Sequence, residues 1–256
     1  MSSKFLKACR NGNMRDVKKS IKLGHNINLV NQFGQNGLIF ACENNQFEIV
    51  QCLIEIKINL NQVDNDGNCA LTYACIRGFS AIVEVLINAN ANLDIVNKKG
   101  LTPLMYAIQE RQTLIACLLI NNNAIIENRF SNGSTPLIYA CDTGNETLVD
   151  ILLSKGAVVN NQSNNGNTAL HYAIKRGYEN NCYIKLLQKG ANPNLKNNNG
   201  DSIFDIIERM ESPGYFNILH IFRPISHEEK FSIRKNVAEI VFHPRNAGIL
   251  FSLDYE

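Results

Sequence analysis

Histidine and cysteine are the side chains in this sequence best able to support catalysis or bind a metal ion. The five histidines are scattered, at His25, His171, His220, His227 and His243. The eight cysteines include no C-x-x-C pair, and no cysteines and histidines are spaced as in a zinc site. The sequence also lacks a phosphate-binding G-x-G-x-x-G or P-loop motif. We therefore expect no catalytic residues, no cofactor, no metal and no small-molecule ligand.

Four of the cysteines follow a regular spacing instead. Cys9, Cys42 and Cys75 are 33 residues apart, Cys141 lies two such periods beyond Cys75, and each follows an alanine. Equivalent residues in adjacent structural repeats are separated by roughly 10 Å, the packing distance of helices, which is too far for a disulfide. We therefore expect reduced cysteines that act as small buried hydrophobic residues on a helix.

The elements that carry these residues are themselves repeated. Gly34, Gly67, Gly100, Gly133 and Gly166 are each 33 residues apart, and Gly200 follows after 34. The same phrase returns at each glycine, most clearly as GLTPLMYA (100–107), GSTPLIYA (133–140) and GNTALHYA (166–173). This phrase resembles the T-P-L-H-x-A signature of the ankyrin repeat. The resemblance implies an all-α solenoid of stacked helix-turn-helix units with β-hairpin loops, with about seven repeats including both caps.

One unit shows how the phrase predicts local structure. Gly133 follows Asn132 in a turn pair, and Thr135 and Pro136 provide an N-cap and a first helical residue. Gly144 can end this helix in the left-handed conformation. A second apolar helix is expected over residues 146–155. A single pair of helices exposes too much apolar surface to be stable alone, so stacking must bury it.

The period also divides the chain. Residues 1–33 form an N-terminal capping repeat, and full repeats begin near Asn31, Asp64, Asn97, Phe130 and Ser163. Residues 197–222 form a degenerate C-terminal cap, which completes an array over residues 1–222. The extra residue before Gly200 lies within residues 177–187 and is expected to lengthen the loop between that unit's helices. Residues 223–256 are expected to form a capping helix and tail, with a recruitment peptide that folds on a partner as the alternative.

Composition restricts the class of partner. Lys and Arg number 25 against 23 Asp and Glu, so the net charge of +2 does not favour nucleic acid or a membrane surface. We find no apolar run long enough to span a bilayer and no signal-peptide pattern. These features predict an intracellular protein, in the cytoplasm or alternatively the nucleus, that is monomeric on its own.

The resemblance implies a binding surface on the concave face, formed by hairpin tips and the exposed side of each first helix. Apolar side chains dominate its first half, where Phe33, Ile76 and Leu101 stand at positions expected to be exposed, and Lys175, Arg176 and Lys196 make the second half basic. The candidate protein-binding residues are Val30, Phe33, Val63, Ile76, Arg77, Val96, Leu101, Glu110, Arg129, Lys175 and Arg176.

Two further sets of residues are expected to be structural. The aromatic residues Phe40, Tyr73, Tyr106, Tyr139 and Tyr172 are 33 apart, and we expect each ring to pack between a first helix and a hairpin with its hydroxyl reaching solvent. The alternative is an aromatic ladder that stacks on bases or peptide side chains. His171 occupies the histidine position of the repeat signature, for which the resemblance implies a hydrogen bond to the adjacent hairpin's backbone.

The sequence therefore favours a non-enzymatic adaptor or scaffold that binds another protein on its concave face. A first alternative is the targeting or substrate-recognition module of a larger kinase, ubiquitin-ligase or effector system. A second alternative is a nucleic-acid binder that uses the basic end, which the near-neutral charge disfavours.

Overall fold

The structure of this chain is a computed structural model that describes residues 2–177 and 181–210. The expected tail helix, the recruitment peptide that is its alternative, and the second part of the C-terminal cap all fall on residues 211–256, outside the described residues.

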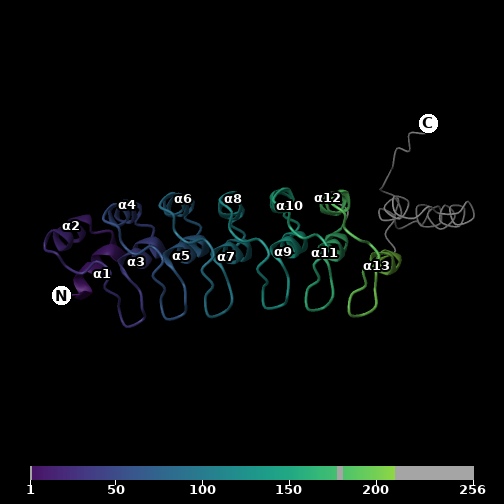
Figure 1. Ribbon diagram of the computed structural model, residues 1–256, viewed down its shortest axis with the longest axis horizontal. Helices are drawn as coiled ribbons and strands as arrows, with labels where there is room; N and C mark the ends of the chain where they lie inside the picture. The colour runs from purple at the N-terminus through teal and green to yellow at the C-terminus, as the bar shows by residue number, and fades with distance from the viewer. Residues whose placement is uncertain (1, 178–180, 211–256) are drawn as a thin grey trace, which may run out of the picture.

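Thirteen helices form in the described residues, in an inner and an outer row. The inner helices are α1 (Ser2–Asn11), α3 (Gly37–Glu43), α5 (Ala70–Arg77), α7 (Pro103–Gln109), α9 (Pro136–Thr143), α11 (Ala169–Arg176) and α13 (Ile203–Met210). The outer helices are α2 (Met14–Lys22), α4 (Phe47–Glu55), α6 (Ser80–Asn88), α8 (Thr113–Asn121), α10 (Glu146–Ser154) and α12 (Cys182–Gln188). Figure 1 shows the inner row between the outer row and a line of hairpins, which is an all-α repeated array, as predicted.

Six hairpins connect each outer helix to the next inner helix, and we number them in chain order. They comprise residues 23–36, 56–69, 89–102, 122–135, 155–168 and 189–202. Residues 177–181 connect α11 to α12, whereas the connections within the preceding repeats have two or three residues. This connection lies within the range 177–187, where the 34-residue spacing predicts the extra residue.

The inner helices begin and end where the repeated phrase predicts. The hydroxyls of Thr102, Thr135 and Thr168 accept hydrogen bonds from the backbone N–H three residues further on, which satisfies a donor that has no partner within the helix. Gly144 closes α9 with a φ of +69°, a conformation that costs glycine little. These caps set the short length of each inner helix.

The core runs the whole length of the described array. One leucine from each inner helix of the five full repeats is no more than 1% exposed, at Leu38, Leu71, Leu104, Leu137 and Leu170. The periodic cysteines are buried free thiols beside them, as expected. Burial raises the pKa of the Cys9 thiol to about 12, and it raises the pKa of Cys42, Cys75 and Cys141 well above the ordinary value. These cysteines therefore serve as packing residues and not as thiolate nucleophiles.

The hairpins contain less strand pairing than the expected β-hairpins. In the described part of the chain, bridges form only between Val63 and Cys69 and between Gln162 and Thr168. Side chains at the start of four turns take up the backbone N–H groups instead; Asn97 Oδ1, for example, accepts from Lys99 N and Leu101 N at 2.9 and 3.0 Å.

Candidate protein-interaction surface

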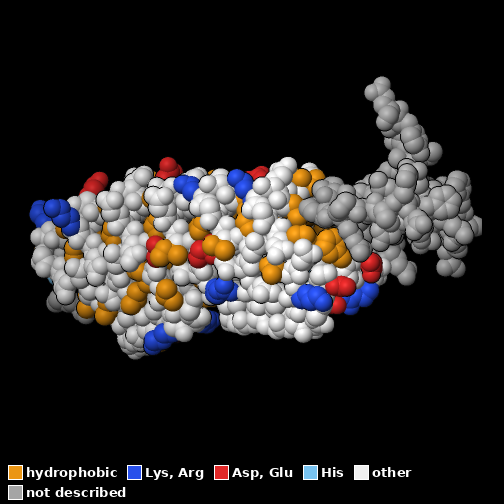
Figure 2. All heavy atoms as spheres, turned by 45° about the vertical axis from the view of Figure 1, so that its right-hand side comes forward, with side chains coloured by type: hydrophobic (Ala, Val, Ile, Leu, Met, Phe, Trp, Pro, Cys, Tyr) orange, Lys and Arg blue, Asp and Glu red, His pale blue; other side chains and the backbone are white. Residues whose placement is uncertain are grey.

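The predicted binding residues lie on the hairpin side of the array and differ in how much of each side chain is exposed to solvent. Phe33, Val96 and Val30 are 57%, 55% and 40% exposed. The charged candidates Arg77, Glu110, Arg129, Lys175 and Arg176 are exposed as well. Figure 2 shows hydrophobic side chains over both halves of the array, and Lys and Arg side chains beside Asp and Glu side chains near the described C-terminal end.

Three of the apolar candidates are less accessible than the sequence suggested. Val63, Ile76 and Leu101 are only half-buried, not exposed. Val63 and Leu101 both pack against the hydrophobic core. The exposed apolar surface of the first half therefore rests on Val30, Phe33 and Val96.

The chemistry of one repeated position changes along the array. The residue that precedes each turn is Val30, Val63 and Val96 in the first three hairpins, and then Arg129, Gln162 and Lys196. Arg129 Nη1 donates to the carbonyls of Gly133 and Gln162 at 3.0 and 2.8 Å. Gln162 Nε2 likewise donates to Gly166 and Lys196 at 2.7 and 2.9 Å. Polar side chains thus tie the later hairpins together, whereas the first three present valine.

Arginines at the ends of two inner helices form ion pairs between repeats. Arg77 lies 3.3 Å from Glu43, and Arg176 lies 3.3 Å from Asp142. All four side chains are partly or largely exposed, so these pairs contribute little to stability. They leave the cations accessible to a partner.

The aromatic residues are half-buried beside the hairpins, as expected, but three hydroxyls are bound and do not simply point to solvent. Tyr73 donates to Asp64 Oδ2 at 2.6 Å, Tyr106 oxygen accepts from Asn97 at 2.8 Å, and Tyr172 oxygen accepts from Asn165 at 3.3 Å. Burial, followed by the bond to Asp64, raises the pKa of Tyr73 to about 12. These rings brace the hairpins.

The fourth full repeat departs from this pattern. Phe130 replaces the Asn, Asp or Ser found at the start of the other turns, and its ring stacks on Tyr139 with centroids 4.9 Å apart. Phe130 is 5% exposed, so an apolar contact replaces the polar brace there. The repeated phrase does not include this residue. Its exchange becomes visible when its turn is aligned with those that begin at Asn31, Asp64, Asn97 and Ser163.

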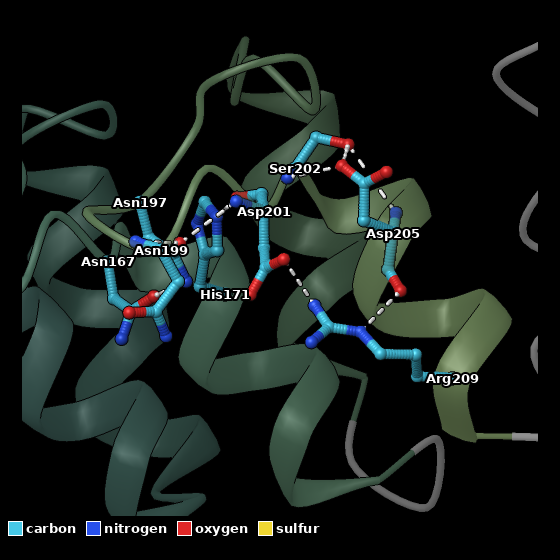
Figure 3. A network of polar contacts seen from close by, with 8 residues as sticks. All are labelled: Asn167, His171, Asn197, Asn199, Asp201, Ser202, Asp205 and Arg209. Carbon is cyan, nitrogen blue, oxygen red and sulfur yellow. Dashed lines mark hydrogen bonds and ion pairs between the residues drawn. The ribbon is translucent and has the colours of Figure 1, made fainter.

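His171 makes the hydrogen bond that the signature implied. Its Nδ1 accepts from Thr168 N at 3.2 Å, so Nε2 carries the proton and donates to the Asp201 carbonyl at 3.2 Å (Figure 3). The ring is 2% exposed, and burial lowers the pKa of His171 despite the opposing effect of Asp201. A neutral imidazole therefore joins α11 to the sixth hairpin.

The last described helix is held by a related set of contacts. Asp205 Oδ2 accepts from Ser202 N and Oγ at 2.7 and 2.5 Å, and these bonds lower the pKa of the Asp205 carboxyl. Arg209 pairs with the Asp201 carboxylate at 2.5 Å (Figure 3). A hollow of about 450 Å³ lies beside these residues, lined in part by Tyr172, Lys175 and Met210.

The described contacts around His171 join structural elements of the array. The polar groups around His171 bind one another, and the described residues that line the hollow include no serine or cysteine nucleophile. In the described residues, no group of His, Cys, Asp and Glu side chains is placed to hold a metal ion.

Comparisons with known proteins establish the family. A model of ankyrin repeats in three copies matches residues 5–97, 58–129, 78–163 and 118–197. These matches extend over most of the chain, and the protein belongs to the ankyrin-repeat family. Among solved structures, it is similar to the ankyrin repeat domain of Bcl-3, a member of the IkappaB protein family. The identity is 26% over 78% of this chain and 91% of that chain, with a TM-score of 0.67. Comparison with curated proteins found no match.

The family and fold support a protein-interaction module, a class of domain that is typically non-enzymatic. Within the described residues, every helix is too short or too polar to cross a membrane.

Proposed function

We propose that this protein is a non-enzymatic adaptor or scaffold that binds a partner protein on the concave face formed by its hairpin tips and inner helices. The proposal rests on exposed side chains in both halves of the array. Val30, Phe33 and Val96 are exposed in the first half, and Lys175 and Arg176 are exposed in the second. The resemblance to the Bcl-3 ankyrin repeat domain supports an interaction role.

The two halves favour a partner segment of mixed character. Exposed apolar side chains gain free energy when a partner covers them, at roughly 25 cal/mol per Å². Exposed cations mainly speed the encounter with acidic groups and add less to affinity. We therefore expect an extended segment with apolar residues for the first three hairpins and acidic residues for the later ones.

The test compares exposed apolar residues on the two sides of the array. Phe33→Asp combined with Val96→Asp places charge on the hairpin side, and Leu114→Asp is the control because Leu114 is 64% exposed on outer helix α8. Affinity purification from the native cell identifies binding proteins, and titration calorimetry with the purified partner then measures each Kd. We expect the double variant to lose binding while the control keeps it, with unchanged circular dichroism in both. Full binding by the double variant would refute the concave-face site.

A second candidate function is the targeting module of a larger system. In that case the captured protein would be a kinase, a ubiquitin-ligase subunit or an effector subunit, and activity would reside there. The same affinity purification distinguishes the adaptor from the targeting module, because it identifies the captured protein.

A further inference from the structure

Five junctions join the six hairpins, and the hairpin bases are connected at every one of them. A side-chain oxygen in one hairpin accepts from a backbone N–H in the next, at 2.8–3.0 Å in each case. At the junction between the third and fourth hairpins the bond joins Asp94 Oδ1 to Ile125 N at 2.8 Å. The bases therefore form an unbroken ladder.

The hairpin tips form a second ladder, and it is broken once. Backbone N–H groups donate to the preceding tip's carbonyl from Asn65 to Phe33, Lys98 to Asp66, Asn164 to Asn132 and Asn198 to Asn165, at 2.8–3.0 Å. The equivalent bond from Ser131 N to the Lys99 carbonyl is missing among the described residues. Figure 1 shows these two hairpins set further apart than their neighbours.

The turn glycines give an independent measure of the same opening. A Cβ added at Gly34, Gly67, Gly133 or Gly166 would meet the next hairpin within about 3 Å. A Cβ added at Gly100 would meet nothing within 4 Å. The third tip therefore has no close neighbour on its C-terminal side.

Two residue exchanges coincide with the separation of the tips. At two of the other four junctions, an amide pair joins consecutive turns: Asn97 Nδ2 donates to Asn68 Oδ1 at 2.8 Å, and Asn197 Nδ2 to Asn167 Oδ1 at 2.9 Å. At the third–fourth junction, the corresponding residues are Leu101 and Phe130. Neither side chain can form a hydrogen bond, and Phe130 stacks within its own repeat on Tyr139 instead.

The inner helices are also loosely joined at this junction. α7 and α9 pack less extensively against each other than α7 packs on α5 or α9 packs on α11. A cavity of about 280 Å³ lies between the two repeats, with Ala116 in its lining where four other outer helices carry valine. On the outer side, contacts persist: Asn145 Nδ2 donates to Thr113 Oγ1 at 2.7 Å, and Lys155 Nζ to the Asn121 carbonyl at 3.4 Å.

We infer that the third–fourth junction is a hinge that divides the interaction surface into two blocks. The axis runs along the outer helices and hairpin bases, where contacts are continuous, and the tips open and close on the other side. The first block presents exposed Val30, Phe33 and Val96 together with Lys98 and Lys99, and the second presents Arg129, Lys175 and Arg176. A partner that binds both blocks would set the angle between them; this consequence rests on the proposed function, whereas the hinge itself does not.

The hinge is tested on the full chain without any partner. Spin-labelled unnatural amino acids at Lys98 and Asn199 report across the junction, and labels at Gln32 and Lys98 report within the first block. All three side chains are exposed, and the native cysteines stay unlabelled. Pulsed electron paramagnetic resonance then measures both distance distributions. We expect the Lys98–Asn199 distribution to be roughly twofold broader than that of Gln32–Lys98.

Repairing the junction provides the matched variant. Leu101→Asn with Phe130→Asn recreates the Asn68 and Asn97 pair, and it should narrow the distribution across the junction and slow hydrogen exchange at Ser131. The reciprocal exchange, Asn68→Leu with Asn97→Phe, should broaden the Gln32–Lys98 distribution. If the repaired chain does not fold, this second variant still tests whether these two positions control the hinge. Equal widths in the native chain, or no response to either exchange, would overturn the hinge. The proposed protein binding would stand in that case, because the measurement contains no partner.

Discussion

The leucine column provides the most direct test of how this array is stabilised. Leu137 lies on α9 in the fourth repeat and is 1% exposed. Leu137→Ala removes three buried carbon atoms, which corresponds to about 2–2.5 kcal/mol at ~0.8 kcal/mol per methylene. The cavity left behind adds to this loss, and measured Leu→Ala changes extend to about 5 kcal/mol. We therefore expect the free energy of unfolding to fall by about 2–5 kcal/mol.

Urea unfolding followed by circular dichroism measures this loss, and Val158→Ala is the control. Val158 is 52% exposed, so its truncation should change the free energy of unfolding by less than about 0.5 kcal/mol. Hydrogen exchange then shows where the stability is lost. Because contacts join only neighbouring repeats, the lost protection should centre on α9 and α10 and spare α1 and α2. A cost below about 1 kcal/mol, or equal loss of protection in α1 and α9, would refute this reasoning.

Three further predictions concern charge and thiols. Because burial holds the folded-state pKa of His171 below its unfolded value, stability should be complete above about pH 6.5 and fall as the pH drops toward the folded-state pKa, then level off. Urea unfolding at pH 7.5 and 5.5 should show a smaller difference in His171→Gln, and an identical difference would contradict the assignment. Iodoacetamide should modify half-buried Cys52 before the buried periodic thiols, as peptide mapping over time can verify, and early modification of Cys42 would argue against its burial. Lys175→Glu with Arg176→Glu should slow association with an acidic partner and reduce its salt dependence in stopped-flow measurements, and an unchanged association rate would exclude steering by this end.

Much of the fold could be read from the sequence because each repeat encodes its own local structure. Thr135, Pro136 and Gly144 determine where α9 begins and ends through bonds and backbone preferences within a few residues. The 33-residue period then places Leu137 and Cys141 beside their counterparts, so the buried core followed from the same pattern. His171 was also readable, because its partner lies one repeat away at a fixed spacing.

Contacts between repeats decided the rest, because they depend on how neighbouring units approach in space. Leu101 looked like an exposed binding residue, but it packs partly on the core. Arg129 looked like a free cation, yet its guanidinium spans two hairpins through backbone carbonyls that the sequence does not reveal as acceptors. Phe130 is visible in the sequence as an exchange of a polar residue for an aromatic one. Only the tertiary structure shows that this exchange coincides with a missing tip bond, because the bond joins backbone groups whose identity does not depend on the side chain.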